Sequence, residues 1–238
     1  MAKKSESITR EIDGHEVSIS NPDKVFFTKR GQTKLDLIEY YETVAGPLMA
    51  TMGGRPTLMQ RFPDGASGKS FFQKRVPKGA PDWLRTTVVS TPNGTTSNAL
   101  IAHDMAHIVW AVNLGCLGFH VWPYRAADPA HADELRIDLD PQPGTDFDDV
   151  RVAAMEVKAV LDELGITGFP KTSGSKGIHI HVRLRPVWDS YQVRYAAVAL
   201  AREMQRRRPD LLTCEWWKEE RGRRVFIDFN QNAPHKTV

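Results

Sequence analysis

The chain has 238 residues, and 32 Lys+Arg against 29 Asp+Glu give it a formal net charge of +3 at pH 7. Hydrophobic residues make up 41% and charged residues 26%, a balance that excludes intrinsically disordered and collagen-like proteins. Two cysteines, Cys116 and Cys214, are too few for a disulfide framework and favour a reducing compartment.

The first half of the chain predicts short strands around two helices. A hairpin with an Asp13-Gly14 turn is predicted within residues 8–19. Thr33 caps a helix with apolar residues at helical spacing through Leu48. Asp104 begins a second helix, which Gly115 ends. The strands predicted around these helices span residues 57–62, 71–75, 86–90, 97–102 and 119–122.

The second half predicts longer elements. Strand 134–140 precedes a helix that Asp146 caps and Gly165 ends. A helix from Asp189 to Arg208 comes later in the chain. The remaining predicted strands span residues 169–172, 178–184 and 225–229. This irregular mixture predicts an α+β fold with mixed or antiparallel sheets flanked by helices. We expect two subdomains that share one interface, at about residues 1–115 and 116–238.

No part of the sequence predicts a membrane segment. The N-terminus is charged and has no apolar stretch behind it, so no secretory signal is expected. The most apolar stretch, residues 99–119, is interrupted by polar side chains and does not read as a span. We therefore expect a cytoplasmic protein. A charge of +3 does not by itself argue for nucleic acid, so such a partner would require basic residues gathered in a patch.

Two carboxylates on one strand are the first candidate site. The period of two along a strand places Asp138 and Asp140 on one face, while Ile137 and Leu139 face the core. Carboxylates this close repel each other unless a divalent cation, or a pair of cations, lies between them. The alternative is an ordinary strand end that meets solvent at Asp140-Pro141.

A third carboxylate, Asp228, lies on a strand with apolar neighbours on both sides. A buried carboxylate is costly unless it is paired with a cation or binds a metal. Arg223 and Arg224 are nearby and offer the alternative partner. Three acids on two strands would complete a two-metal site.

The loop Ser173-Gly-Ser-Lys176-Gly177 consists mainly of small residues, and such a loop can turn its backbone N–H groups onto a phosphate. It is not a Walker A loop, because the Gly-Lys-Ser/Thr order is absent. His179 and His181 share a face of the following strand and could both reach a ligand or a metal, although a structural role is the alternative.

Aromatic and basic residues are mixed in the run Phe71-Phe72-Gln-Lys-Arg75, which is the composition of a platform for stacking bases. A half-buried core position is the alternative for the two phenylalanines. By residue type alone, Lys24 and Lys34 are ordinary surface lysines.

Three segments together resemble the motifs of the archaeo-eukaryotic primase superfamily. They are Asp138-Leu-Asp140, the run Ser-Gly-Ser-Lys-Gly-Ile-His179, and Phe-Ile-Asp228-Phe-Asn-Gln-Asn. The resemblance is closest to the polymerase domain of bacterial ligase D, used in non-homologous end joining, and to its stand-alone relatives. It runs from about Val17 to the end and includes Asn21-Pro-Asp-Lys24-Val, Gly31-Gln-Thr-Lys34, Gly54-Arg-Pro56 and Phe119-His120-Val-Trp-Pro123.

The resemblance implies a primase-like fold with its catalytic site in a cleft between two subdomains. It also implies roles for individual residues. Asp138, Asp140 and Asp228 would bind two catalytic divalent ions, commonly Mn²⁺ and alternatively Mg²⁺. The residues implied to bind the incoming NTP or dNTP are Ser173, Lys176 and His179 at the triphosphate, His120 beside the metal site, and Arg61 and Arg221 along the pocket.

For DNA, the resemblance implies that Lys24 and Lys34 grip the 5′-phosphate downstream of a gap or break, and that Phe71 and Phe72 pack against template bases. The implied function is template-dependent addition of nucleotides, preferentially ribonucleotides, to a 3′-hydroxyl by a two-metal mechanism. The implied partners are DNA, a Ku-type end-binding protein and an ATP-dependent DNA ligase, which would place the chain at the nucleoid of a bacterium.

Two departures from the family pattern are visible. Members usually continue past the Asn-Gln-Asn stretch with a segment that contains a tyrosine and basic residues, so we expect a domain truncated at its C-terminus. Gln60 stands where some relatives carry a lysine. The alternatives are a catalytically weak module that binds DNA ends and a two-metal phosphodiesterase or nuclease that uses the same acids.

Overall fold

The computed structural model describes residues 6–91 and 93–237, and the chain divides into two compact units at Trp122 and Pro123. The sequence analysis placed this boundary near residue 115, before the strand β9 (Cys116–Val121). In the structure β9 pairs with β5 (Pro56–Arg61) along its whole length, and this pairing keeps β9 in the first unit.

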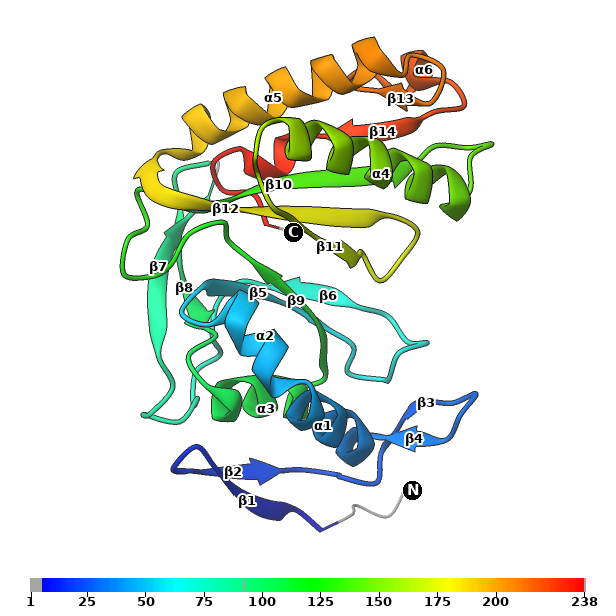
Figure 1. Cartoon of the computed structure of the whole chain (residues 1–238). Coiled ribbons are helices and arrows are strands. Elements are labelled where there is room, and N and C mark those ends of the chain that lie inside the picture. Colours follow the sequence, from blue (N-terminus) through cyan, green and yellow to red (C-terminus); the bar gives the residue numbers. More distant parts are fainter. Residues whose placement is uncertain (1–5, 92, 238) are drawn as a thin grey trace. The chain divides into compact units, whose positions relative to one another are not determined.

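The first unit contains two small hairpins, a sheet and three helices (Figure 1). Its elements, in chain order, are β1 (Ile8–Ile12), β2 (His15–Ile19), β3 (Val25–Phe27), β4 (Gln32–Thr33), α1 (Lys34–Thr43), α2 (Ala45–Met52), β5, β6 (Phe71–Gln73), β7 (Thr86–Ser90), β8 (Thr96–Ile101), α3 (Met105–Asn113) and β9. All strand pairs of this unit are antiparallel.

The Asp13-Gly14 turn forms as expected. Both residues have positive φ angles, 48° and 78°, as a primed two-residue turn requires. The helix expected from Thr33 to Leu48 is instead two helices, α1 and α2, with a break at Val44. Pro47 explains the break, because proline lacks the N–H that a continuous helix would need at that position.

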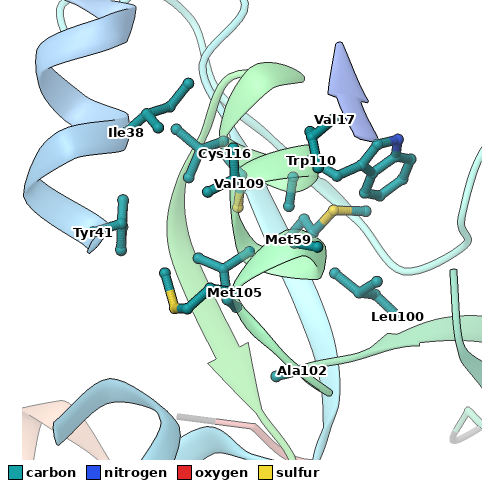
Figure 2. Packing of buried hydrophobic residues seen from close by; sticks show 14 of the residues in the cluster. Val17, Ile38, Tyr41, Met59, Leu100, Ala102, Met105, Val109, Trp110 and Cys116 are labelled. Carbon is teal, nitrogen blue, oxygen red and sulfur yellow. The ribbon is translucent and has the colours of Figure 1, made fainter. Parts of the chain in front are cut away.

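α3 is the centre of the first unit's core. Its residues Met105, Val109 and Trp110 pack with Met59 of β5 and Tyr41 of α1 in one buried cluster (Figure 2). Asp104 caps α3 by accepting a hydrogen bond from the backbone N–H of His107 at 3.1 Å. β5 is therefore paired on both edges and contributes Met59 to the same core as α1 and α3.

The second unit is one five-stranded sheet with two long helices. Its elements are β10 (Ala132–Pro141), α4 (Phe147–Glu163), β11 (Gly168–Thr172), β12 (Ile178–Trp188), α5 (Ser190–Arg207), β13 (Leu212–Thr213), α6 (Lys218–Arg221), β14 (Val225–Asp228) and the 3₁₀ turn η1 (Asn230–Asn232). The strand order is β11-β12-β10-β14-β13, and β13 is parallel to β14 whereas the other pairs are antiparallel.

The two faces of this sheet differ in chemistry. Alternate residues of β10, Leu135, Ile137 and Leu139, pack with α4 and α5 in a second buried core. The residues between them are charged and lie on the opposite face. The sequence predicts a cap at Asp146 and a helix start at Asp189, and in the structure each of these residues caps its helix with a capping box. The sheet thus presents one apolar and one polar face.

Candidate active site

Three carboxylates meet on the polar face of the second unit's sheet. Asp138 and Asp140 lie two residues apart on β10, and Asp228 of β14 is the direct antiparallel partner of Asp138. Oxygen atoms of all three side chains lie within 4.8 Å of one another. Strand pairing therefore assembles the acidic site that the sequence predicts.

Burial and mutual repulsion make this cluster unfavourable on its own. Asp138 is 5% exposed, and burial, together with the charges of Asp140 and Asp228, raises its pKa to about 8. Burial also raises the pKa of Asp140 and of Asp228. Within the described part of the chain, the buried Oδ1 of Asp138 accepts no hydrogen bond. Closely spaced carboxylate oxygens with an unsatisfied buried atom fit the ligand set of Mg²⁺ or Mn²⁺.

Two basic residues continue the row across the sheet. His179 of β12 is the partner of Asp138, and Lys171 of β11 is the partner of His179. His179 Nε2 lies 3.4 Å from Asp138 Oδ1. Burial lowers the pKa of Lys171, whose Nζ donates to the carbonyl oxygen of Thr172 at 2.7 Å. A row of cross-strand partners therefore crosses the sheet, with the acidic Asp228 and Asp138 at one end and the basic His179 and Lys171 at the other.

The loop between β11 and β12 is held by the hydroxyl of Ser173. Its Oγ accepts hydrogen bonds from the backbone N–H groups of Ser175 and Gly177 at 3.2 and 3.1 Å. No hydrogen bond from the backbone N–H of Gly174 or Lys176 occurs among residues 6–91 and 93–237. Two amides and the exposed lysine side chain are consequently available for an anion.

Gly177 brings this loop against β10. A Cβ atom there would lie 2.4 Å from the carbonyl oxygen of Leu139 and 3.4 Å from Asp140 Oδ1. Only glycine permits this approach, so the residue type at position 177 places the loop directly beside the carboxylates.

Arg221 is the cation on the other side of the acidic cluster. Its guanidinium stacks on Phe226, with Cζ 3.4 Å from the ring centroid, and donates to the carbonyl oxygens of Glu215 and Trp216 at 3.0 and 2.8 Å. Its charge acts to lower the pKa of both Asp140 and Asp228, against the larger effect of burial. The two backbone bonds and the Phe226 ring together hold the guanidinium in place.

Gln231 contacts two of the three carboxylates, and the sequence analysis gave it no role. Its Nε2 donates to Asp228 Oδ2 at 3.2 Å and to Asp138 Oδ2 at 3.4 Å. Its place in the run Asn-Gln-Asn, directly after the third acid, is the sequence feature that could have indicated this position.

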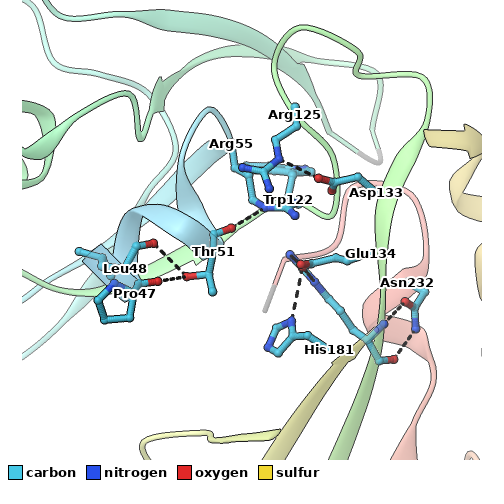
Figure 3. Close-up of polar contacts among 11 residues, drawn as sticks. Pro47, Leu48, Thr51, Arg55, Trp122, Arg125, Asp133, Glu134, His181 and Asn232 are labelled. Carbon is cyan, nitrogen blue, oxygen red and sulfur yellow. Dashed lines mark hydrogen bonds and ion pairs between the residues drawn. The ribbon is translucent and has the colours of Figure 1, made fainter. Parts of the chain in front are cut away.

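A second polar cluster lies one row from the carboxylates and was also not predicted. Arg136 is 1% exposed and donates from Nε to Glu134 Oε1 at 2.6 Å. His181, the strand partner of Arg136, has Nδ1 3.5 Å from the same oxygen (Figure 3). Asn232 exchanges two hydrogen bonds of 2.8 Å with the backbone of Arg136. His181 thus pairs with Glu134, not with the acidic cluster.

In the first unit, His120 and Phe72 share one face of the sheet with Gln60. Gln60 is the partner of Phe72, and its Oε1 lies 3.3 Å from His120 Nε2. The Phe72 and His120 rings meet edge to face, 5.3 Å between centroids. Arg61 and Phe71 are partners on the opposite face, with the guanidinium carbon 5.3 Å from the ring centroid. The two phenylalanines are both exposed but point to different faces.

Lys24 and Lys34 are brought together in the first unit. The backbone N–H of Lys34 donates to the carbonyl oxygen of Lys24 at 2.8 Å. Lys34 is only 4% exposed, and its Nζ donates to the carbonyl oxygens of Ser20 and Asn113. Burial and the charge of Lys24 lower the pKa of Lys34 to about 8. Lys24 Nζ donates to the carbonyl oxygen of Pro63.

Comparison with known proteins identifies the family. The family model described as LigD, primase-polymerase domain matches residues 33–238. This chain belongs to the LigD primase-polymerase family. The membership confirms the resemblance drawn from the motifs.

Two LigD proteins are similar in sequence to most of this chain. The multifunctional non-homologous end joining protein LigD of Mycolicibacterium smegmatis is 32% identical over 224 residues, covering 93% of this chain and 29% of that protein. The bifunctional LigD of Bacillus subtilis is 34% identical over 217 residues, covering 91% of this chain and 34% of that protein. The chain therefore spans about a third of the length of these relatives.

A solved structure shows the same fold. The polymerase domain of Mycobacterium tuberculosis ligase D in complex with DNA superimposes with a TM-score of 0.87 at 32% identity. The match covers 93% of this chain and 80% of that one. It confirms the expected α+β fold. Among the described residues of this primase-polymerase domain, no helix is long and apolar enough to cross a membrane.

Proposed function

We propose that this domain adds nucleotides, preferentially ribonucleotides, to the 3′-hydroxyl of a primer strand at gaps or double-strand breaks in DNA, directed by a template. The observation that carries the proposal is the carboxylate cluster of the buried Asp138 and the half-buried Asp140 and Asp228, with the 173–177 loop beside it. Nucleotidyl transfer needs both parts: cation ligands at the reacting phosphate and a cradle for the triphosphate.

The three carboxylates are the ligands we propose for two divalent ions, Mn²⁺ or Mg²⁺. When bound, such ions supply positive charge that activates the primer hydroxyl and neutralises charge developing on the α-phosphate. Gln231 holds Asp138 and Asp228 by hydrogen bonds, which fixes the orientation of both carboxylates. His179 of the neighbouring strand β12 contacts the other oxygen of Asp138, with Nε2 3.4 Å from Oδ1.

The incoming nucleotide is proposed to bind through its triphosphate. The free amides of the loop and the Lys176 side chain provide donors and charge, and Ser173 keeps the loop in shape. Arg221 lies on the far side of the carboxylates, where its fixed guanidinium would balance phosphate charge. His120 and Arg61 of the first unit are proposed to line the nucleotide site, as the family resemblance implies.

DNA is the proposed substrate. Lys24 and Lys34 lie together and form the proposed 5′-phosphate pocket, and the exposed Phe71 and Phe72 are the proposed contacts to template bases. A 2′-hydroxyl on the incoming nucleotide offers an additional hydrogen-bonding group, which is the chemical basis for a ribonucleotide preference. A Ku-type end-binding protein and an ATP-dependent ligase are the proposed partners, which would bring the domain to chromosomal DNA.

Primer extension on a duplex with a one-nucleotide gap tests this function. The assay compares Mn²⁺ with Mg²⁺, ribonucleotides with deoxyribonucleotides, and a 5′-phosphate with a 5′-hydroxyl. Asp138→Ala is the inactive variant, and Asp162→Ala, which removes an exposed carboxylate of α4, is the matched control. The proposal expects metal-dependent addition that the 5′-phosphate stimulates and only Asp138→Ala abolishes.

Two other results would contradict the proposal in different ways. Tight, phosphate-dependent binding of DNA without any addition would identify a module that binds ends. Loss of labelled DNA in the absence of nucleoside triphosphate would identify a phosphodiesterase that uses the same carboxylates.

A further inference from the structure

The segment from Lys69 to Lys78 is basic and aromatic and contains no acidic residue. It carries four cationic side chains within ten residues, Lys69, Lys74, Arg75 and Lys78, all exposed. Between them lie Phe71 and Phe72, with 45% and 58% of their surface exposed. Exposed aromatic rings interleaved with positive charge are typical of surfaces that bind single-stranded nucleic acid.

The structure places this segment beside a second strand. β6 and β8 lie end to end on the same side of β5, with β6 paired to residues 59–61 and β8 to residues 56–57. After β6 the chain continues along β8. The backbone N–H of Val76 donates to Asn98 O at 2.9 Å, and Arg75 Nη2 donates to Thr96 O at 3.2 Å.

A surface cavity of about 360 Å³ opens where the two chain segments meet. It is lined by Arg75, Val76, Pro77, Lys78, Thr96, Ser97 and Asn98. Two of these side chains are cationic, three carry hydroxyl or amide groups, and none is a carboxylate. Among the described residues, the Lys78 ammonium and the Asn98 amide make no side-chain hydrogen bond or ion pair. The chemistry of the cavity is therefore that of an anion site.

A chain of contacts runs from Phe71, on the opposite face from Phe72, to the backbone of Arg75 at the cavity. The Arg61 guanidinium lies over the Phe71 ring and donates from Nη1 to Gln73 Oε1 at 2.6 Å. Gln73 Nε2 in turn donates to the carbonyl oxygen of Arg75 at 2.9 Å. Arg75 is the third residue after Phe72, so their Cα atoms are at most about 10 Å apart. A base at Phe72 and a phosphate in the cavity can belong to one strand.

We propose that this cavity binds a backbone phosphate of the unpaired template strand, next to the base that stacks on Phe72. The inference rests on the proposed function, since a template is what a polymerase carries past these residues. The proposed function already includes contacts of Phe71 and Phe72 with template bases. The inference adds a site for a backbone phosphate of the same strand, formed by Arg75, Lys78 and Asn98. Unpaired DNA is the ligand because an exposed ring at a sheet edge can stack only on bases that are not already stacked in a duplex.

The first test measures binding of fluorescent DNA by anisotropy over a range of salt concentrations. The variants are Lys78→Gln and the double variant Arg75→Gln/Lys78→Gln, and the control is Arg151→Gln/Lys158→Gln, which removes two exposed charges from α4. The substrates are a primer–template with a single-stranded template overhang and a blunt duplex of equal length. Melting curves confirm that each variant is folded.

The proposal expects about tenfold weaker binding of the overhang substrate by the double variant, and an intermediate loss for Lys78→Gln. Affinity for the blunt duplex and all affinities of the control stay within about twofold of wild type. Loss of this one phosphate contact in the double variant also reduces the slope of log K against log[salt] for the overhang substrate by about 0.7. Equal losses on overhang and blunt DNA would overturn the proposal, because the two charges would then act on duplex DNA. An unchanged overhang affinity in the folded Lys78→Gln and double variants would overturn it as well.

The second test locates the phosphate. Single methylphosphonate substitutions, which remove one negative charge, are placed along the template overhang. At one position the substitution should weaken wild-type binding and have no further effect in the double variant. A different result would overturn the proposal: no methylphosphonate position weakens binding, but inorganic phosphate or ATP competes with DNA for wild type and not for the double variant. The cavity would then be a site for free phosphate or nucleotide. Both tests measure DNA binding and do not require nucleotide addition. A wild-type protein that adds no nucleotide would contradict the proposed function, whereas only the binding results decide whether the cavity holds a template phosphate.

Discussion

Asp138 and Asp228 lie directly opposite each other on the antiparallel strands β10 and β14, both on the polar face of the sheet. Directly opposed residues in such a pair have their Cβ atoms about 4.5–5.5 Å apart, and like charges at this distance destabilise a sheet. Burial of Asp138 strengthens the repulsion, because water does not screen it. The arrangement is unfavourable for folding and favourable for binding a divalent cation, and three predictions about this site follow from that conflict.

Replacement of Asp138 or Asp228 by asparagine should abolish nucleotide addition. Each substitution keeps the shape of the side chain and removes one anionic ligand from the cluster. Loss of several kcal/mol of stabilisation at the reacting phosphate corresponds to a rate at least about 100-fold lower. Single-turnover extension with saturating Mn²⁺ measures the rate, and Asp162→Asn on α4 is the control. A rate within tenfold of wild type for either variant would contradict the assignment of these carboxylates as cation ligands.

The same Asp138→Asn variant should be more stable than wild type when divalent cations are removed with EDTA. The substitution removes one buried charge and its repulsion with the other two carboxylates. We expect the Tm at pH 8 to rise by about 3 °C or more, the shift that about 1 kcal/mol produces in a chain of this length. Differential scanning fluorimetry in EDTA measures it, and a lower Tm than wild type would argue against buried repulsion.

The Tm difference between Asp138→Asn and wild type in EDTA should increase as the pH rises. The pKa of Asp138 is raised to about 8 in the folded chain and is near 3.8 when unfolded. Between these values the folded state holds a proton that the unfolded state has lost, so stability decreases as pH rises through this range. The Tm advantage of Asp138→Asn in EDTA should therefore be small at pH 5 and largest near pH 8. Added Mn²⁺ should reverse the order of the two proteins.

Local patterns in the sequence predicted much of this site. The strand period placed Asp138 and Asp140 on one face, and the small residues at 173–177 indicated a loop whose backbone N–H groups could bind a phosphate. The residues alone could not show that Asp228 is opposite Asp138, because strand register depends on contacts between distant segments. Gln231 was missed for a related reason, since its role depends on how the 3₁₀ turn η1 folds back toward β10.

The sequence was less informative about where individual side chains point. Phe71 and Phe72 are both exposed, as expected for a stacking platform, but strand geometry turns them to opposite faces. Lysine is rarely buried, yet Lys34 is enclosed. The carbonyl oxygens of Ser20 and of Asn113, the last residue of α3, accept hydrogen bonds from its ammonium. Only the packing of α1 against α3 reveals this.

Replacement of Gly177 by alanine should impair nucleotide binding. The added Cβ would lie 2.4 Å from the carbonyl oxygen of Leu139, so either the loop or β10 must shift. The loop's position beside Asp140 is then lost, and we expect KM for the nucleotide to rise at least about tenfold. Steady-state extension at varied nucleotide concentration measures KM. Gly46→Ala in α2, where a Cβ meets no atom within 4 Å, is the control and should leave KM unchanged. A KM for Gly177→Ala within twofold of wild type would show that the loop position does not matter.

Lys24 and Lys34 should both contribute to recognition of a 5′-phosphate, and substitutions at the two positions should have different costs. Lys24→Ala removes a partly exposed cation, so we expect a lower preference for phosphorylated over unphosphorylated gaps and little change in Tm. Lys34→Ala also leaves the buried carbonyl oxygens of Ser20 and Asn113 without a donor, which costs about 1–3 kcal/mol of stability. Anisotropy with the two gapped substrates and a melting curve separate these effects. Equal Tm losses for the two variants would contradict the difference in burial.

The phosphate preference should also weaken at high pH. Burial and the charge of Lys24 lower the pKa of Lys34 to about 8, so its ammonium is charged at pH 7 and largely neutral at pH 9. The ratio of affinities for phosphorylated and unphosphorylated gaps should therefore fall between pH 7 and pH 9, with a midpoint near pH 8. Because a 5′-phosphate is already a dianion above pH 7, its own ionisation does not produce this change. Lys34→Ala should show a low and constant ratio over the same range, while Lys24→Ala keeps a transition that moves to higher pH, because the charge of Lys24 no longer lowers the pKa of Lys34. A wild-type ratio that stays constant to pH 9 would mean that the Lys34 ammonium does not contact the phosphate and serves only to join Ser20 to α3.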